Sequence, residues 1–141
     1  MIKQRILAFL IALVVVVFDQ ASKYWILNAL SLIDVQNILP VLDLRLAMNH
    51  GVAFSLFSQY GGHTPWILIG FTSVLSVVIA LLIIQSKPNE SIQRYCYGLI
   101  LGGALGNLID RLRFGAVVDF IDCHIGSHHW PVFNLADSFI C

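Results

Sequence analysis

Apolar residues gather in long runs along this chain, separated by shorter polar segments. The three longest runs cover residues 6–27, 65–84 and 95–112. A helix needs about 20 mainly apolar residues to cross the hydrocarbon core of a bilayer. A fourth apolar segment occupies residues 133–141 and is too short to cross. The pattern predicts three transmembrane helices and the truncated beginning of a fourth.

Basic residues predict how these helices are oriented. One pair precedes the first run and another separates the second run from the third: Lys3, Arg5, Lys87 and Arg94. Lys and Arg are more frequent in cytoplasmic loops. Because an even number of spans separates the two pairs, both fit the cytoplasmic side. Residues 28–64 and 113–132 are then expected to lie outside the cytoplasm.

The first outer segment carries the pattern of a strand. Between 42 and 48, leucine or methionine occupies every second position, which is the period of a strand. Residues 49–51 read Asn-His-Gly, a turn signal, and residues 52–57 could return as a second strand. We therefore expect a small β-hairpin on the membrane surface. The second outer segment, with its glycines and proline, is expected to be less regular.

The composition is that of a membrane protein. Hydrophobic residues make up 58% of the 141 residues and charged residues only 11%, whereas soluble domains carry about 25% charged residues. The formal net charge is zero, so nothing points to a nucleic-acid partner. The three cysteines show no disulfide framework. These properties predict a single domain over residues 1–141, an all-α membrane bundle with a small extracytoplasmic β-hairpin or cradle.

Ionisable residues interrupt the first run. Asp19 and Lys23 lie four positions apart, so a helix places them on one face. Each charge inside a bilayer costs about 2.5–3.5 kcal/mol on insertion scales, and such residues persist when they pair or when they function. We expect an ion pair that braces a nearby site, with the amine of Lys23 extending toward the outer surface.

The third run combines two stripes of residues. The first stripe is typical of close helix packing and consists of Gly98, Gly102 and Gly106. The second shares a neighbouring helical face and consists of Gly103, Asn107, Asp110 and Arg111. A structural hydrogen-bond network is one interpretation of this polar face. We favour a face that lines a site, because Asn, Asp and Arg together exceed what packing requires.

Two aspartates follow the third run. Asp119 lies in the second outer segment and Asp137 lies 18 positions later, in the last apolar segment. Closing a loop of this length costs little extra entropy, so the two carboxyl groups can meet at the outer surface. Carboxylates a few ångström apart share one proton, because both cannot ionise freely. One can take a proton from water while the other protonates or polarises a carbonyl, which predicts amide hydrolysis without a covalent intermediate.

Three other interpretations compete with hydrolysis. A metal site would use His124, His128 and His129 with Asp119 or Asp122. Their spacing differs from that of a zinc-protease helix, so we expect neither a metal nor another cofactor. A proton- or ion-coupled transporter would use the residues Asp19, Lys23, Asp110 and Arg111. A non-catalytic assembly subunit would use the glycine stripe to bind partner helices.

Five motifs follow one another along nearly the whole chain. They are DQASK at 19–23, NHGVAFS at 49–55, GGALGNLIDR at 102–111, VVDF at 117–120 and FNLADS at 133–138. In type and order they resemble the motifs D-Q-x-S-K, N-x-G-x-A-F-S, G-G-A-x-G-N-x-x-D-R, V-V-D-F and F-N-x-A-D-S of bacterial lipoprotein signal peptidase, or signal peptidase II. Chance is a poor explanation for five matches in the family's order.

The resemblance implies four transmembrane helices, both termini in the cytoplasm and a periplasmic β-cradle. It implies an aspartic peptidase of the bacterial inner membrane whose active site faces the periplasm. The implied partners are membrane lipid and a prolipoprotein, which is cut just before a diacylglyceryl-modified cysteine. Inhibitors of the globomycin type act on this family. No cofactor, metal or obligate protein partner is implied.

The matching motifs also imply roles for individual residues. The catalytic pair falls on Asp119 and Asp137. Supporting and substrate-binding positions fall on Asp19, Lys23, Asn49, Gly51, Asn107, Arg111, Asn134 and Ala136.

Overall fold

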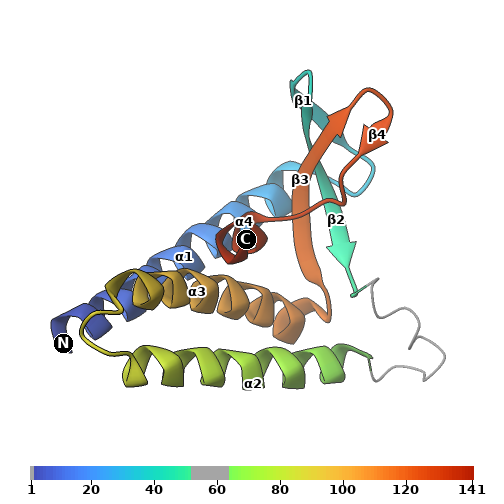
Figure 1. The fold of residues 1–141 in the computed structure, drawn as a ribbon. Coiled ribbons are helices and arrows are strands. Elements are labelled where there is room, and N and C mark those ends of the chain that lie inside the picture. Colours follow the sequence, from blue (N-terminus) through green and yellow to red (C-terminus); the bar gives the residue numbers. More distant parts are fainter. Residues whose placement is uncertain (1, 52–63) are drawn as a thin grey trace.

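The computed structural model of the chain describes residues 2–51 and 64–141 (Figure 1). The return strand expected at 52–57 lies outside the described residues. The elements in chain order are α1 (Ile2–Ala29), β1 (Val35–Leu39), β2 (Leu42–Asn49), α2 (Thr64–Gln85), α3 (Ser91–Phe114), β3 (Val117–Ile125), β4 (His128–His129) and α4 (Leu135–Ile140).

Helices α1, α2 and α3 form one part of the molecule (Figure 1). Helix α3 packs against both others, whereas α1 and α2 make few contacts with each other. The glycines of α3 allow its close approach to α1. A Cβ added at Gly98 would lie 2.5 Å from the carbonyl oxygen of Ala8, and one added at Gly102 would lie 2.6 Å from Cβ of Val15. The predicted packing role of these two glycines is confirmed.

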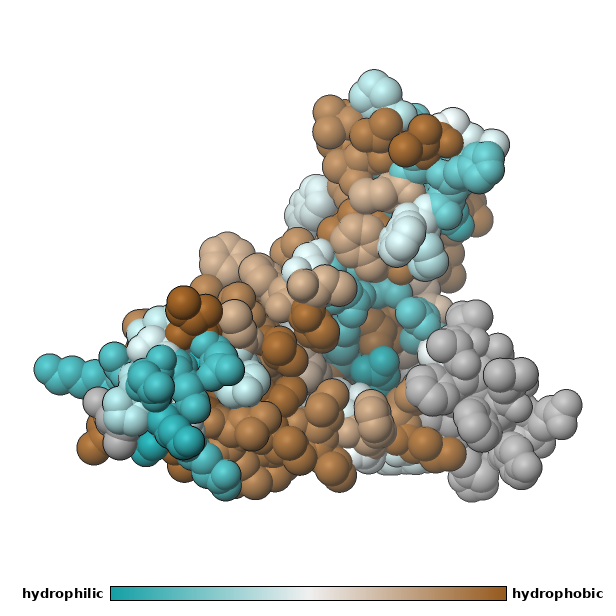
Figure 2. Space-filling view, viewed as in Figure 1, coloured by the Kyte–Doolittle hydropathy of each residue, from teal (hydrophilic) through white to brown (hydrophobic). Residues whose placement is uncertain are grey.

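Two of the described helices are long and apolar enough to cross a membrane, Ile2–Ala29 and Trp66–Gln85. Large apolar side chains cover their outer surface, among them Phe18 at 61% and Phe71 at 63% exposure (Figure 2). A continuous surface of this kind suits acyl chains better than water. Helix α3 is long enough to cross a membrane, but the polar residues on one of its faces lower its mean hydropathy, so it is not one of these two helices. The crossing of the membrane by α3, and by a fourth helix that begins with α4, stays a prediction.

An antiparallel sheet with the order β1-β2-β3-β4 stands beside the end of α1 (Figure 1). The strand predicted from alternating leucines is confirmed, because β2 covers Leu42–Asn49. Our expectation that residues 113–132 are less regular is wrong, since β3 has nine residues and pairs with β2. The first four residues of β3 are all buried. A strand buried on both faces shows no alternation of polar and apolar positions.

A small apolar core joins the sheet to the helices. The side chain of Ile26 in α1 is fully buried and packs in one cluster with Val118 and Phe120 of β3. The segment that leads into α4 is tied to the same strand, because Ile121 donates a backbone hydrogen bond to the carbonyl oxygen of Phe133 at 2.8 Å. Strand β3 and the start of α4 are therefore held together at the end of α1.

Candidate active site

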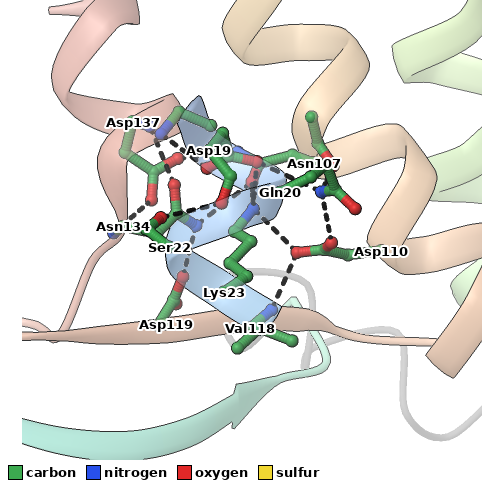
Figure 3. Close-up of polar contacts among 12 residues, drawn as sticks. Asp19, Gln20, Ser22, Lys23, Asn107, Asp110, Val118, Asp119, Asn134 and Asp137 are labelled. Atoms are coloured by element: carbon green, nitrogen blue, oxygen red, sulfur yellow. Dashed lines mark hydrogen bonds and ion pairs between the residues drawn. The ribbon is translucent and has the colours of Figure 1, made fainter. Parts of the chain in front are cut away.

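Buried polar side chains gather where the helices meet the sheet. In the space-filling view, hydrophilic atoms occupy a recess between the apolar surfaces of helices and sheet (Figure 2). The residues come from five elements, and most of them are drawn in Figure 3: Asp19, Gln20, Lys23, Asn49, Asn107, Asp110, Asp119, Asn134 and Asp137. Six of these side chains are buried, and those of Gln20, Asn49 and Asp137 are half-buried. We call the whole set the buried polar cluster. Polar groups persist away from water only when they are hydrogen-bonded, so their partners indicate what each one does.

Lys23 lies at the centre of the cluster (Figure 3). Its Nζ lies 2.8 Å from Oδ2 of Asp19 and 2.7 Å from Oδ2 of Asp110. It also donates to Oδ1 of Asn107 at 3.0 Å. The expected ion pair with Asp19 is present, but the amine does not extend toward the outer surface, because Lys23 is 2% exposed. The second carboxylate, that of Asp110, turns the amine inward.

The start of α4 fixes the backbone and side chain of Asp137. Asn134 is the N-cap, and its Oδ1 accepts from the amide of Asp137 at 3.0 Å. In return, Oδ2 of Asp137 accepts from the amide of Asn134 at 3.3 Å. This reciprocal arrangement is a capping box, which satisfies two amides that the helix leaves without partners. The cap holds the carboxyl group of Asp137 at the helix N-terminus.

Asp119 is 1% exposed and accepts two amide hydrogen bonds. Asn134 donates from Nδ2 to its Oδ1 at 2.7 Å, and Asn49 donates from Nδ2 to its Oδ2 at 2.9 Å. Burial raises the pKa of Asp119 from 3.8 to about 6; the two hydrogen bonds oppose the rise and the negative charge of Asp137 adds to it. The carboxyl group therefore changes protonation at a pH suited to general acid–base chemistry.

Two asparagines connect the aspartates that the sequence analysis selected. Asn134 Nδ2 donates to Asp119 and also to Oδ1 of Asn107, the latter at 3.1 Å. Asn107 Nδ2 in turn donates to Oδ1 of Asp137 at 2.8 Å. Asn134 thus touches both carboxyl groups, one through its side chain and the other through its backbone amide. The structure brings the two aspartates into one hydrogen-bonded network.

Asn49 and Gly51 form the turn that ends β2. The amide of Gly51 donates to Oδ1 of Asn49 at 2.8 Å. Gly51 has a φ of 86°, a left-handed conformation that favours glycine. The bond orients the Asn49 side chain, so that its Nδ2 faces Asp119. Gly51 therefore supports the cluster through its backbone.

The last two expected residues differ in how they join the cluster. The amide of Ala136 donates to Oδ1 of Asp19 at 2.9 Å, and its side chain is fully buried. The guanidinium of Arg111 lies 3.5 Å from the carbonyl oxygen of Asn107, a long contact. Its charge also acts on Asp137 and on other carboxyl groups of the cluster. Toward the part of the chain that the structure describes, Arg111 is thus a neighbouring cation that acts mainly through its charge.

The sequence-based site set omitted two members of the cluster, Gln20 and Asp110. Gln20 Nε2 donates to Oδ1 of Asp110 at 2.9 Å and to Oδ2 of Asp19 at 3.2 Å. Asp110 Oδ2 accepts from the amide of Val118 at 3.1 Å. A signal for Asp110 existed, because it shares a helical face with Asn107 three positions earlier. Gln20 adjoins Asp19, and only the packing of α1 against α3 shows its role.

A second polar group lies elsewhere on the sheet. His129 Nδ1 lies 2.9 Å from Oδ1 of Asp122, and His124 Nε2 lies 3.3 Å from Oδ2 of Asp43. A groove of about 540 Å³ opens beside these histidines and contains no residue of the buried polar cluster. Within the described residues, no three His, Cys, Asp or Glu side chains are arranged to hold a metal ion. This groove therefore lies apart from the carboxyl pair, and the pair remains the better candidate for the chemistry.

Comparisons with known proteins show which family the fold represents. Residues 11–141 match the family model described as signal peptidase (SPase) II. A lipoprotein signal peptidase of Serratia proteamaculans is 44% identical over 131 residues, which cover 93% of this chain and 78% of that protein. One from Escherichia coli is 43% identical over 131 residues, covering 93% of this chain and 80% of that protein.

A solved structure is similar in fold as well. It is a bacterial membrane enzyme determined by the in meso method at 1.9 Å resolution, with a TM-score of 0.82 and 32% sequence identity. The match covers 94% of this chain and 84% of that one. The helices and the sheet described above therefore form a known membrane-enzyme fold.

Proposed function

Because the chain belongs to the signal peptidase II family, we propose that Asp119 and Asp137 are the catalytic pair with which it cleaves prolipoproteins. The chain is a membrane peptidase that removes signal peptides from prolipoproteins, and a transporter is not supported. One observation carries the assignment of the pair: within a buried cluster, Asn134 hydrogen-bonds both carboxyl groups.

The two aspartates divide the work of amide hydrolysis. Asp119 is the acid: burial raises its pKa to about 6, and in its protonated form it donates a proton to the oxygen of the scissile carbonyl. Asp137 takes a proton from water, whose oxygen forms a bond to the carbonyl carbon. The resulting diol returns a proton to Asp119, the carbon–nitrogen bond breaks, and the amine leaves with the proton held by Asp137. No covalent intermediate forms.

The position of the cluster fits a lipid-anchored substrate. The basic residues Lys87 and Arg94 lie at the opposite end of the helices, and such residues favour the cytoplasmic side. The carboxyl pair then lies at the outer leaflet of the bacterial inner membrane. A diacylglyceryl-modified cysteine keeps its acyl chains in that leaflet, so the bond before it reaches the pair. Lipid anchoring supplies the positioning that accelerates the reaction.

Asn49 and Arg111 are the substrate-binding candidates nearest to the pair. Asn49 already donates to Asp119. The guanidinium of Arg111 carries five donors, and among residues 2–51 and 64–141 it makes one long contact, with the carbonyl oxygen of Asn107. Donors of this kind, placed beside the pair, can bind substrate carbonyl groups. A peptide inhibitor of the globomycin type would occupy the same position.

The test compares Asp119→Asn and Asp137→Asn with the unchanged chain. Each variant, purified in detergent, is incubated with a diacylated and with a non-lipidated precursor. We expect both variants to lose cleavage of the diacylated precursor, because each removes one carboxyl group of the pair. The non-lipidated precursor should be a poor substrate for every form of the protein.

Asp122→Asn is the matched control. Asp122 is an aspartate of the same strand as Asp119, is equally buried at 1% exposure, and contacts neither member of the pair. Its substitution should leave cleavage per folded molecule unchanged. Robust cleavage by Asp119→Asn or by Asp137→Asn would disprove the assignment. Normal cleavage by both would mean that other groups of the protein perform the hydrolysis.

A further inference from the structure

Two carboxylates of the cluster hold backbone amides that directly precede the catalytic residues (Figure 3). Oδ1 of Asp19 accepts from the amide of Ala136 at 2.9 Å, one residue before Asp137. Oδ2 of Asp110 accepts from the amide of Val118 at 3.1 Å, one residue before Asp119. The two contacts are equivalent in position, although one holds a helix and the other a strand.

Lys23 connects these two carboxylates. Its Nζ lies 2.8 Å from Asp19 and 2.7 Å from Asp110, and all three side chains are at most 2% exposed. The bridge therefore runs from Ala136 through Asp19, Lys23 and Asp110 to Val118. Each link is a charge-assisted contact, the strongest class of hydrogen bond in proteins.

We propose that Asp110 is a positioning residue which, through this bridge, sets the separation of the carboxyl groups of Asp119 and Asp137. The inference rests on the proposed function, since it assigns a role in aligning that catalytic pair. Asp110 touches neither carboxyl group in the contacts described, so it acts through the backbone at Val118.

The contacts around Asp110 hold its side chain in one orientation. Its Oδ1 accepts from Gln20 Nε2 at 2.9 Å, while its Oδ2 is shared between Val118 and Lys23. Both oxygens are thus engaged, and the side chain is 1% exposed. A carboxylate held in this way cannot rotate without losing a contact. A small misplacement of reacting groups, near 1 Å, lowers a rate by about 100-fold.

Asp110→Glu separates position from charge. The substitution keeps the carboxylate for Lys23 but adds one methylene group, which displaces the contact with Val118. We expect kcat for the diacylated precursor to fall by about 10- to 100-fold. KM should change by less than about threefold, because Asp110 does not contact substrate. A purely structural role would lower the amount of folded protein and leave kcat per folded molecule unchanged.

Asp110→Asn removes charge and keeps size. The charge of Lys23 is then balanced by Asp19 alone, so more of it acts on Asp119, whose pKa it lowers. We expect a fall in kcat together with a shift of the high-pH limb of the activity profile to lower pH. Gln20→Leu leaves the carboxylate of Asp110 in place and removes the donor to its Oδ1, together with the longer contacts to Asp19 and to the carbonyl oxygen of Gly106. It should lower kcat in the same direction by a smaller factor. If neither Asp110 variant folds, the kcat of Gln20→Leu tests the positioning role.

Asp122→Asn serves again as the buried control, and Asp119→Asn separates the two proposals. Wild-type kcat per folded molecule in Asp110→Glu and Asp110→Asn, with Asp119→Asn inactive, would overturn the positioning role alone. Wild-type kcat in Gln20→Leu would do the same if the other two do not fold. Cleavage by Asp119→Asn would instead overturn the proposed function and this inference with it.

Discussion

The two ends of the helical bundle both bury charge, and they do so in opposite ways. At one end, the guanidinium of Arg94 is fully buried and donates to Ser86 Oγ at 2.6 Å, to Gln4 Oε1 at 2.9 Å and to the carbonyl oxygen of Lys87 at 2.6 Å. These acceptors are neutral, and two of them lie at the carbonyl end of α2, which favours a cation. The positive charge of Arg94 is therefore stabilised by neutral acceptors, and no group at this end needs to change its protonation.

At the other end, carboxylates outnumber cations. Asp19, Asp110, Asp119 and Asp137 meet Lys23 and the neighbouring Arg111. Burial, and after it the negative charge of Asp137, favour the protonated form of Asp119, and its pKa therefore rises to about 6. The two ends thus differ in charge balance: the buried charge of Arg94 is satisfied by neutral acceptors, whereas the unbalanced group of carboxylates lies where we propose the chemistry.

Lys23→Met should have the largest effect on stability, because it leaves Asp19 and Asp110 buried with no cation between them. Breaking a buried ion pair by removing one partner costs about 3–5 kcal/mol. Thermal unfolding in detergent measures the loss. The double variant Lys23→Met/Asp110→Asn should be more stable than the sum of the single effects predicts, since it removes one of the stranded charges. Strict additivity would show that the bridge does not act as a unit.

Arg94→Met tests the other end. Methionine fills a similar volume but donates nothing to Ser86, Gln4 or Lys87. Hydrogen bonds from a charged group contribute about 1.5–3 kcal/mol, and we expect a loss of that order in the free energy of unfolding. Cleavage per folded molecule should not change, in contrast to Asp110→Glu. A fall in kcat for the folded Arg94 variant would contradict the division of roles between the two ends.

Gly106→Ala should be destabilising and should also lower activity. A Cβ at Gly106 would overlap the carboxylate of Asp19, whereas one at Gly70 has no atom within 4 Å. Overpacking of this kind costs about 1–3 kcal/mol, and the displaced Asp19 would release the amide of Ala136. Gly70→Ala is the matched control, and it should be neutral or up to about 1 kcal/mol stabilising. Equal melting temperatures for the two variants would show that Asp19 can move freely.

The smallest effects concern the protonation of Asp119. Asp137→Asn removes a negative charge and should lower the pKa of Asp119, whereas Asn49→Ala removes a donor to the ionised carboxylate and should raise it. Nuclear magnetic resonance titration of Asp119 in micelles measures both shifts. A shift in the same direction for both variants would refute the electrostatic origin of the raised pKa.

The same raised pKa affects stability. Because the folded value of about 6 exceeds the ordinary value of 3.8, the unfolded chain ionises first as the pH rises. The contribution of Asp119 to stability is therefore fully present below pH 3.8 and is lost as the pH rises through 6. In Asp119→Asn this titrating group is absent, so the free energy of unfolding should depend less on pH between 3.8 and about 6. Thermal unfolding at a series of pH values measures this dependence.

Local patterns in the sequence determined much of this protein. The long apolar runs of α1 and α2, the glycine stripe of α3 and the alternating leucines of β2 follow from helix and strand periodicity. The aspartates could be selected because ionisable groups near a bilayer are costly and seldom lack a function. The five motifs, in their order, identified the family. Each of these features depends on residues close together in the chain.

Only the tertiary structure decided how the buried charges are connected. Strand β3 escaped notice because its buried residues do not alternate, and its place beside β2 depends on a partner about 70 positions away. The inward turn of Lys23 requires Asp110, and the role of Gln20 depends on a residue 90 positions later. Sequence periodicity shows which face of a helix or strand is apolar. It does not show which distant acceptor a buried donor will bind. The pairing of buried donors with distant acceptors is what distinguishes the end of the bundle around Arg94 from the end where we propose the chemistry.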